Sequence, residues 1–550
     1  MPDILLTSVS YSGYISIVKL LVFLVLFFSW LPLVSWVYKD AKGVGSKEVF
    51  WTAVVFGAGA VAAIIWLVIP VFIIGMLVYL IAVGVASVSY VTERNAKVPD
   101  FDRVLTAEHI KGLFASKSEE TEDSREFIFI TANNNEVPVP EPKTPEFFGY
   151  KTAVNIFTDA IRRRASDIVF LPTPQNYNAA YYVDGAALKQ PSIARDQMEY
   201  FIHFLKGLAD LDTDEKRKPQ KGRFRINKDK KNTEWEVTTA GSTAGEQIKI
   251  KQITQFRITK LADIGLPSDQ YEQLNKICQM KQGLFIVAGP KKSGVTSTFY
   301  GLLRSHDAFL NSICTLERQP TDKLPNIVQN VFTLSDTSTT TYARKLQAIV
   351  RTEPSIIGVA DCEDNETAKI TCEAARGGKL IYVTLEADNV IKALGKWLKL
   401  VDDKNLAVEP LLGLSNQRLL RKLCEQCKQA YEPNKELLRK FNIPAEKAKV
   451  LYRAGKVQYD KRGKPISCEN CHETGFVGRM PVFEIILVDD ELRKAIIQSS
   501  TLSEISTQFR RAKMLYLQEQ ALRKVIDGTT AVNEMVRIFS ASKKQDVKKP

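Results

Sequence analysis

The sequence predicts an α/β protein with transmembrane helices at its N-terminus, and three observations predict it. Two uncharged apolar regions, 20–37 and 50–91, occupy most of the first hundred residues. From about residue 275 onward, apolar runs alternate with helix-like runs, which indicates a parallel sheet with helical crossovers. Between one such strand and helix, residues 289–296 have the composition of a phosphate-binding loop. At 550 residues, the chain is long enough for several domains.

The N-terminal region is predicted to be a membrane anchor, residues 1–92, with helices at about 14–37, 50–68 and 71–91. One bilayer crossing needs ~20 apolar residues. The second apolar region is about twice that length, and Pro70 offers a turn near its middle. A cleaved signal peptide is one alternative for the first helix, but no basic segment precedes it and no small-residue cleavage site follows. A buried hairpin of a soluble protein is another, although such helices rarely lack charge for so long.

Basic residues favour one orientation of this anchor. Nothing basic lies between the second and third helices, whereas the first loop and the region after the third helix contain Lys39, Lys42, Lys47, Arg94, Lys97 and Arg103. The positive-inside rule therefore predicts a multi-pass protein of the plasma (inner) membrane, with most of the chain cytoplasmic. The formal net charge of +13 suits an anionic lipid surface. Nucleic acid is disfavoured as a partner, because no basic-aromatic patch or reading helix is visible.

The rest of the chain divides by composition. Residues 93–145 are predicted to be a polar linker, with an acidic run at 118–123 and prolines at 137–142. Residues 146–260 are predicted to form a small α+β domain. Residues 261–540 are predicted to form a nucleotide-binding α/β domain that includes a zinc subdomain at 420–480, followed by a disordered basic tail at 541–550.

The predicted phosphate-binding loop lacks one expected side chain. Backbone N–H groups of such loops cradle phosphates, a lysine after the second glycine reaches the β- and γ-phosphates, and the next Ser or Thr holds Mg²⁺. Thr296 is present, but Val295 stands at the lysine position. Two nearby lysines are interpreted as solvated loop charges, with the alternative that one of them replaces the missing lysine. Backbone donors still predict binding of ATP with Mg²⁺, by the residues Gly289, Pro290, Lys291, Lys292, Ser293, Gly294, Val295 and Thr296.

Four of the eight cysteines form two C-x₂-C pairs, separated by forty residues. Two pairs of thiolates supply the four ligands of a tetrahedral Zn²⁺ ion. A redox pair is the competing interpretation, but duplication of the motif favours a structural zinc site that stabilises the fold without taking part in catalysis. The predicted ligands are Cys424, Cys427, Cys468 and Cys471.

The order of short motifs over residues 146–540 resembles one family, the type II secretion and type IV pilus assembly ATPases, which are cytoplasmic hexameric motors. Each motif is weak, but their order along the chain is specific. The resemblance implies a RecA-like P-loop ATPase domain with a zinc-binding insertion and a helical C-terminus. It also implies a homo- or hetero-hexamer that works with an inner-membrane platform and pilin-type components. The motifs are 165–168, 183–185, 218–223, 245–247, 365–368, 417–419 and 474–479.

Departures from the family pattern fall on its catalytic positions. The resemblance implies three catalytic residues, Asp361, Glu317 and Arg351, the last as a candidate intersubunit arginine. Asp361 stands where the family usually has glutamate, Glu317 is followed by arginine, and only one of two expected arginines remains. Gln347 stands at the position of the missing arginine. Other departures are two histidine positions, occupied by Lys379 and Glu386, and, in the N-terminal domain, Val169 and Glu236.

The expected loss in rate favours an enzyme with weakened activity. Loss of an arginine that stabilises transition-state charge costs on the order of 10³–10⁵ in rate. The sequence therefore predicts a membrane-anchored pseudo-ATPase subunit that binds ATP with weak or absent hydrolysis. One alternative is an active motor in which Lys291 or Lys292 replaces the missing lysine. Another is a nucleic-acid or membrane adaptor that uses the basic charge.

Overall fold

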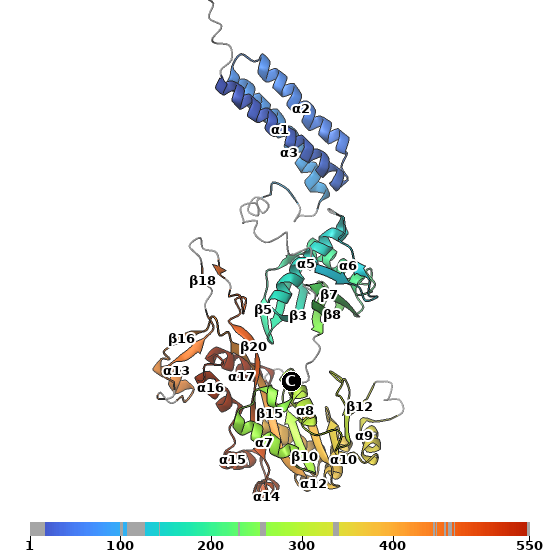
Figure 1. The fold of residues 1–550 in the computed structure, drawn as a ribbon, viewed down its shortest axis with the longest axis vertical. Coiled ribbons are helices and arrows are strands. Elements are labelled where there is room, and N and C mark those ends of the chain that lie inside the picture. Colours follow the sequence, from blue (N-terminus) through green and yellow to red (C-terminus); the bar gives the residue numbers. More distant parts are fainter. Residues whose placement is uncertain are drawn as a thin grey trace, which may run out of the picture. The chain divides into compact units, whose positions relative to one another are not determined.

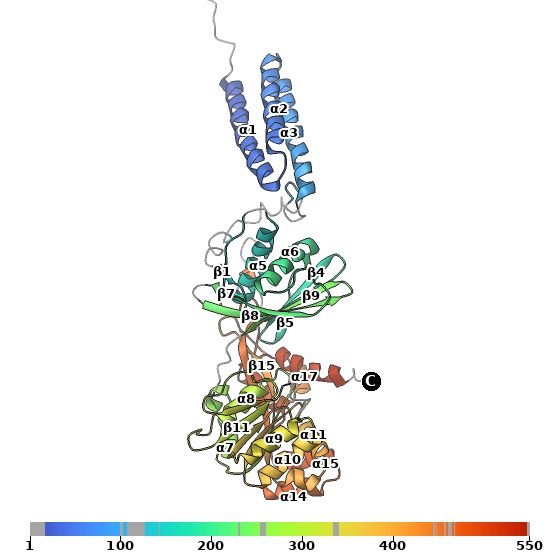
Figure 2. The same ribbon diagram turned by 90° about the vertical axis from the view of Figure 1, so that its right-hand side faces the viewer.

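The protein divides into two compact units, residues 1–182 with 187–253, and residues 183–186 with 254–550. Both are seen in a computed structural model, which is drawn in Figures 1 and 2. The residues that it describes are 17–98, 103–106, 127–141, 144–228, 231–253, 260–333, 340–443, 446, 448–455, 458–459, 465–466 and 468–546.

Three helices near the N-terminus are long and apolar enough to cross a membrane: α1 (Ile17–Val44), α2 (Glu48–Val68) and α3 (Phe72–Lys97) (Figure 1). Helices α1 and α3 continue past the predicted ends at 37 and 91. The reason is that two of the charged side chains beyond those ends are buried against each other. Arg94 Nε lies 2.8 Å from the Asp40 carboxylate, and the Tyr90 hydroxyl donates to the same carboxylate at 2.6 Å. The predicted start at residue 14 lies outside the described residues.

Small residues let these helices approach closely. A Cβ at Gly59 would lie 2.2 Å from the Trp30 ring, and a Cβ at Gly75 would lie 2.3 Å from the Trp66 ring. The Trp30 indole also donates to the Val55 carbonyl oxygen at 3.2 Å. Because apolar lipid gives helices little reason to associate, such contacts and interhelical hydrogen bonds hold membrane bundles together. The three helices therefore form one packed bundle.

The next domain is a sheet covered on one face by two helices, α5 (Pro145–Arg162) and α6 (Arg195–Leu208) (Figure 2). Aromatic side chains fill the layer between them, and Phe157 contacts Phe224 and Trp235 with ring centroids 5.5 and 5.2 Å apart. The strand order is β2-β1-β7-β8-β9-β3-β4-β5, with β6 paired to β4. The strands are β1 (Phe127–Ile130), β2 (Glu136–Val137), β3 (Ala165–Pro172), β4 (Asn176–Val183), β5 (Ala186–Lys189), β6 (Ile193–Ala194), β7 (Gln220–Lys228), β8 (Lys231–Ser242) and β9 (Gly245–Ile253).

This domain begins earlier than the predicted boundary at residue 146. Strand β1 pairs antiparallel with β7, and its Phe129 side chain is fully buried. The prediction of a linker over 93–145 was wrong here because it averaged the composition of the whole segment. Four apolar residues at 127–130 alternate toward the core within polar surroundings. The acidic run at 118–123 lies outside the described residues.

The second unit is built on a seven-stranded sheet in the order β12-β11-β13-β14-β10-β15-β20. All neighbouring strands in it are parallel except β15 and β20, which are antiparallel. Strands buried on both faces have continuous apolar sequences, which is why the sequence shows unbroken runs here. The strands are β10 (Gly283–Ala288), β11 (Ile313–Glu317), β12 (Val328–Val331), β13 (Ile356–Val359), β14 (Leu380–Leu385), β15 (Leu411–Leu423) and β20 (Phe476–Leu487).

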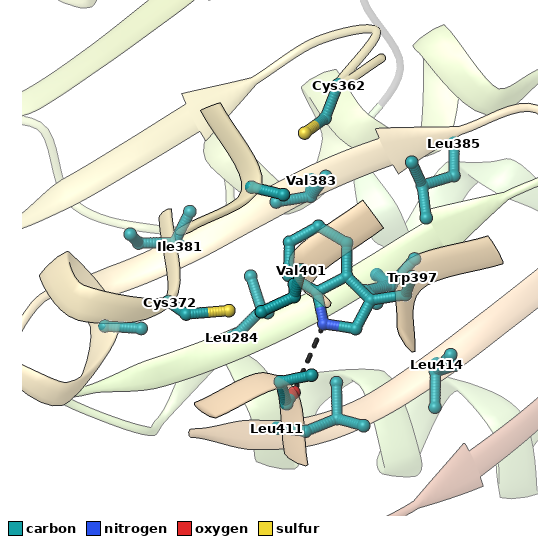
Figure 3. Packing of buried hydrophobic residues seen from close by; sticks show 14 of the residues in the cluster. Leu284, Cys362, Cys372, Ile381, Val383, Leu385, Trp397, Val401, Leu411 and Leu414 are labelled. Atoms are coloured by element: carbon teal, nitrogen blue, oxygen red, sulfur yellow. Dashed lines mark hydrogen bonds between the residues drawn. The ribbon is translucent and has the colours of Figure 1, made fainter. Parts of the chain in front are cut away.

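Helices cover both faces of this sheet. On one face, Phe285 and Val287 pack against α8 (Val295–Leu303). On the other face, Trp397 lies at the centre of a cluster with Leu284 and Cys372, and its Nε1 donates to the Ala407 carbonyl oxygen at 3.2 Å (Figure 3). The other helices around the sheet are α7 (Ser268–Cys278), α9 (Tyr342–Arg351), α10 (Asn365–Arg376), α11 (Val390–Val401), α12 (Lys404–Val408), α14 (Asp490–Gln498) and α15 (Leu502–Arg511), with a 3₁₀ helix at Leu261–Ile264.

A small cysteine-bearing subdomain lies between β15 and β20. It contains β16 (Gln429–Tyr431), α13 (Lys435–Lys440), β17 (Leu451–Arg453), β18 (Gln458–Tyr459) and β19 (Pro465–Ile466). Two helices follow at the C-terminus, α16 (Leu517–Ile526) and α17 (Val532–Asp546). The prediction of a disordered tail from 541 was wrong for 541–546, where α17 continues. Alanine and lysine there are good helix formers, and 547–550 lie outside the described residues.

Candidate functional site

The predicted phosphate-binding loop joins the end of β10 to the start of α8. Two of its residues have left-handed backbone conformations, Lys292 with φ of 64° and Gly294 with φ of 89°. Such conformations turn successive N–H groups toward one concavity and make an anion-binding nest. There is no space for a side chain at Gly289, because a Cβ would lie 2.3 Å from Ser293 Oγ and 3.1 Å from the Gln417 carbonyl oxygen. The loop therefore has the shape that anion binding requires.

One buried side chain of the loop, Ser293, is left with a spare donor. Ser293 is 4% exposed, and its hydroxyl has no hydrogen-bond partner among the described residues. Its carbonyl oxygen accepts a hydrogen bond of 3.0 Å from Gln417 Nε2, so β15 holds the loop in place. Buried polar atoms are almost always paired. An unpaired hydroxyl at the centre of an anion nest therefore suits a phosphate oxygen.

The lysine position is occupied by an apolar side chain that is half-buried. Val295 packs against the cluster between the sheet and α8, and its Cγ2 would lie 2.9 Å from a Cβ at Gly289. Lys291 and Lys292, the two predicted substitutes, are both exposed to solvent, as is Thr296. Within this loop, only Lys291 and Lys292 could bring a positive charge to a phosphate.

Asp361 follows β13 at the carboxyl edge of the sheet. Its N–H donates to Thr384 Oγ1 at 2.8 Å, and its φ of 52° turns the chain sharply there. Burial is the main cause that raises the pKa of Asp361, and the nearby Glu363 carboxylate raises it further. The Arg318 guanidinium acts in the opposite direction and lowers this pKa. Arg318 lies over the Tyr342 ring at 4.7 Å and pairs with Glu363 at 3.9 Å. Asp361 therefore lies at the edge where Mg²⁺ would bind, among other carboxylates.

Glu317 at the end of β11 is enclosed by donors from the protein itself. Its carboxylate accepts from the Tyr300 hydroxyl at 2.5 Å, from Thr315 Oγ1 at 2.7 Å and from Gln329 Nε2 at 3.2 Å. The residue is 3% exposed. Both oxygens are thus engaged, and a water molecule or metal could reach this carboxylate only after the network opens.

We expect Tyr300→Phe to lower the free energy of unfolding by ~1–3 kcal/mol, because it leaves one oxygen of the buried Glu317 carboxylate without its donor. Denaturant unfolding measures this change. Tyr271→Phe, at a half-buried position on α7, is the matched control. Equal losses for the two variants would show that the Tyr300 hydroxyl does not support Glu317.

The two predicted histidine positions lie at opposite ends of β14. Seven residue steps of ~3.3 Å each separate Lys379 from Glu386 by about 23 Å. Lys379 pairs with Glu353 at 2.5 Å at the amino end of the strand. Glu386 follows the carboxyl end, where the Ala387 N–H donates to the Gly289 carbonyl oxygen at 3.4 Å. Only Glu386 therefore lies beside the phosphate-binding loop.

Arg351, predicted as catalytic, does not lie near the loop of its own chain. It is the last residue of α9 and is exposed. The start of this helix is at the carboxyl edge, since the Tyr342 hydroxyl donates to the Leu316 and Ala360 carbonyl oxygens. Ten helical residues at ~1.5 Å each carry the chain about 15 Å toward the amino edge. An intersubunit role for Arg351 stays a prediction.

The four predicted zinc ligands come together. Their sulfur atoms all lie within 4.8 Å of one another, with Cys424 Sγ 3.8 Å from Cys468 Sγ and Cys427 Sγ 3.5 Å from Cys471 Sγ. Tetrahedral zinc with Zn–S bonds of ~2.3 Å separates its sulfurs by about 3.8 Å. The Gly475 N–H donates to Cys471 Sγ at 3.3 Å, the kind of contact that stabilises a thiolate. The donor set and its spacing fit zinc.

Comparison with known proteins identifies the family of this chain. A family model for "Type II/IV secretion system protein" matches residues 149–537, more than half of the chain. The chain belongs to this family. Within the secretion-protein family, the type IV pilus assembly ATPase PilB of Thermus thermophilus is 29% identical over 425 residues, which cover 77% of this chain and 46% of that protein. The chain thus spans about half the length of this relative.

Two further similarities are with one curated protein and one solved structure. A putative type II secretion system protein E of Escherichia coli is 29% identical over 394 residues, covering 70% of this chain and 76% of that protein. Among solved structures, the Legionella pneumophila ATPase DotB is 15% identical with a TM-score of 0.49, covering 73% of this chain and 98% of that chain.

Sequence reasoning identified the loop, the cysteines and the acidic positions of this secretion-family protein, but it missed the residues that constrain them. Tyr300 lies on the helix that follows the loop, facing the sheet, and Gln329 lies on β12. Gln417 was noted only as part of a family motif. The helical spacing of Tyr300 could have indicated a residue that faces the core, whereas its bond to Glu317 depends on the packing of α8 over β11.

Proposed function

We propose that this chain is a membrane-anchored secretion or pilus-assembly ATPase subunit that binds ATP with Mg²⁺ but hydrolyses it weakly or not at all. The observation that carries this proposal is Val295, whose apolar side chain packs where the phosphate-gripping lysine is expected. The nest around Ser293 and Gly294 supports binding through backbone donors. Thr296 and Asp361 are the residues that would hold Mg²⁺ beside the bound phosphates.

The missing lysine and the enclosed Glu317 both favour weak turnover. A charge-assisted hydrogen bond contributes ~1.5–3 kcal/mol, so its loss at the lysine position weakens the hold on the transferred phosphate. Glu317 is enclosed by its own hydrogen bonds and is poorly placed to orient water. Arg351 lies at the far edge of the sheet and can serve only the nucleotide of a neighbouring copy in a homo- or hetero-hexamer.

The alternative is an active motor in which an exposed loop lysine replaces the missing one. Lys292→Ala in the full-length protein, purified in detergent with zinc, separates the two. Our proposal expects phosphate release near background in the wild type and no change in the variant. Lys281→Ala, at an exposed lysine before β10, is the matched control. Clear wild-type turnover that Lys292→Ala abolishes and Lys281→Ala preserves would establish the motor instead.

We also propose that the four-cysteine cluster binds a structural Zn²⁺ ion. The bound ion would close residues 424–471 onto the end of β15 and would have no open position for catalysis. Zinc content of the purified full-length chain, measured by mass spectrometry, tests this. Less than about a tenth of an equivalent from zinc-supplemented cells would contradict it.

The three N-terminal helices are proposed to anchor the ATPase part at the inner face of the membrane. Covalent attachment would replace recruitment by a membrane partner and raise the local concentration of the assembly near a platform and pilin-type components. Membrane fractionation tests this proposal. Recovery of the intact chain in the soluble fraction after lysis would contradict it.

A further inference from the structure

We propose that the phosphate-binding loop holds two phosphates of a nucleotide and contributes no added affinity for a third, so that a nucleoside diphosphate binds at least as tightly as the triphosphate. This inference rests on the proposed function, because it assumes that the loop binds a nucleotide. It goes further by naming the class of nucleotide that the loop prefers. It follows from where the structure places donors, apolar groups and carboxylates around the loop.

The donors of the loop lie where the first two phosphates of a nucleotide would lie. In loops of this kind, backbone N–H groups cradle the α- and β-phosphates. Ser293 adds a buried hydroxyl without a partner among the described residues, and this hydroxyl lies across the loop against Gly289. The left-handed backbone of Gly294 starts α8, whose N-terminus adds further donors. These groups are intact, so the diphosphate part of the site is retained.

The third phosphate lacks the lysine that loops of this kind place at position 295. A lysine at position 295 would reach between the β- and γ-phosphates. The Val295 side chain instead packs into the apolar cluster under α8 and offers only methyl groups. Arg318 cannot replace it, because β11 lies three strand spacings from β10, ~14 Å away. Its guanidinium also stacks on Tyr342 and pairs with Glu363.

A carboxylate lies on the same side instead. Leu385 pairs with Ala288 in the sheet, so the next residue, Glu386, lies opposite Gly289. By strand alternation Glu386 shares the sheet face of Tyr382, which packs in the same cluster as α8. Neighbouring strands are ~4.8 Å apart. A carboxylate beside the loop repels phosphate charge, and the triphosphate carries more of that charge than the diphosphate.

Competition binding to the purified full-length chain tests the preference. A fluorescent diphosphate nucleotide is displaced with ADP and with ATP, each with and without Mg²⁺. In the wild type, ADP is expected to displace the probe at the same concentration as ATP or at a lower one. Val295→Lys is expected to shift the ratio toward ATP by about tenfold or more, as for a restored charge-assisted contact.

Two more variants complete this test, one that removes the carboxylate charge and one that serves as a matched control. Glu386→Gln at an exposed position removes the negative charge without altering the loop, and it is expected to shift the ratio toward ATP by severalfold. Val328→Lys makes the same change as Val295→Lys at an exposed site on β12, and it is expected to leave the ratio unchanged.

The outcomes separate this inference from the proposed function. ATP binding tenfold tighter than ADP in the wild type would overturn the inference and leave nucleotide binding standing. An unchanged ratio in both Val295→Lys and Glu386→Gln would also overturn it. Displacement by neither nucleotide at millimolar concentration, or failure of the probe to bind, would overturn the inference and the proposed function together.

Discussion

Cys471→Ser is expected to unfold the cysteine-bearing subdomain while the seven-stranded sheet stays folded. Metal binding contributes on the order of 10–16 kcal/mol to small zinc domains, and a missing ligand removes much of it. Ile443 and Leu451 of the subdomain are buried in a cluster that they share with β20 and α16, so the subdomain depends on zinc rather than on a core of its own. Loss of zinc, measured by mass spectrometry, and rapid trypsin cleavage within residues 424–471 are the expected results.

The sheet should survive because β15 and β20 pair along most of their length, up to Leu423 and Phe476. Cys278→Ser, at a half-buried cysteine on α7, is the control and should retain both zinc and protease resistance. A Cys471→Ser protein with full zinc and unchanged cleavage would show that the four thiols do not form a metal site.

Asp40→Ala is expected to destabilise the helix bundle by ~3–5 kcal/mol, because it leaves the buried Arg94 guanidinium without its carboxylate. Both side chains are about 5% exposed. Unfolding by a denaturing detergent measures the change. Tryptophan fluorescence follows it, since four of the six tryptophans lie in α1 and α2.

The double variant Asp40→Leu with Arg94→Met is the control for this pair. Replacing both buried charges by apolar side chains of similar size is often neutral or stabilising. We expect the double variant to regain most of the lost stability. Equal destabilisation by the single and double variants would indicate that the loss comes from packing rather than from an unpaired charge.

Much of the fold could be predicted because its signals are local. The apolar lengths of α1 to α3 and the unbroken apolar runs of β10 and β14 are visible residue by residue. The ends of α1 and α3 were harder to predict. Charged residues such as Asp40 and Arg94 indicate a loop outside the membrane, unless it is known that they pair with each other across 54 residues. Strand β1 was missed because its four residues pair with β7, about a hundred residues away in the sequence.

The candidate site shows the same limit. The loop residues are contiguous in sequence and the zinc ligands form two closely spaced C-x₂-C pairs, so both could be predicted from spacing alone. The enclosure of Glu317 requires Tyr300 and Gln329, from two other elements, and no sequence period indicates it. The positions of Lys379 and Arg351 at the amino edge of the sheet likewise emerge only from the topology. A motif places a residue in the sequence, whereas the strand direction decides which edge it occupies.

A single-turnover experiment tests the central claim most directly. The zinc-loaded full-length protein is mixed in excess with radiolabelled ATP and Mg²⁺, and the conversion of bound ATP to ADP is followed by acid quench. With Val295 at the lysine position and Glu317 enclosed, we predict that bound ATP persists for many minutes without measurable ADP. Conversion at about 1 s⁻¹ or faster, within the usual range of ATP-driven enzymes, would contradict the claim.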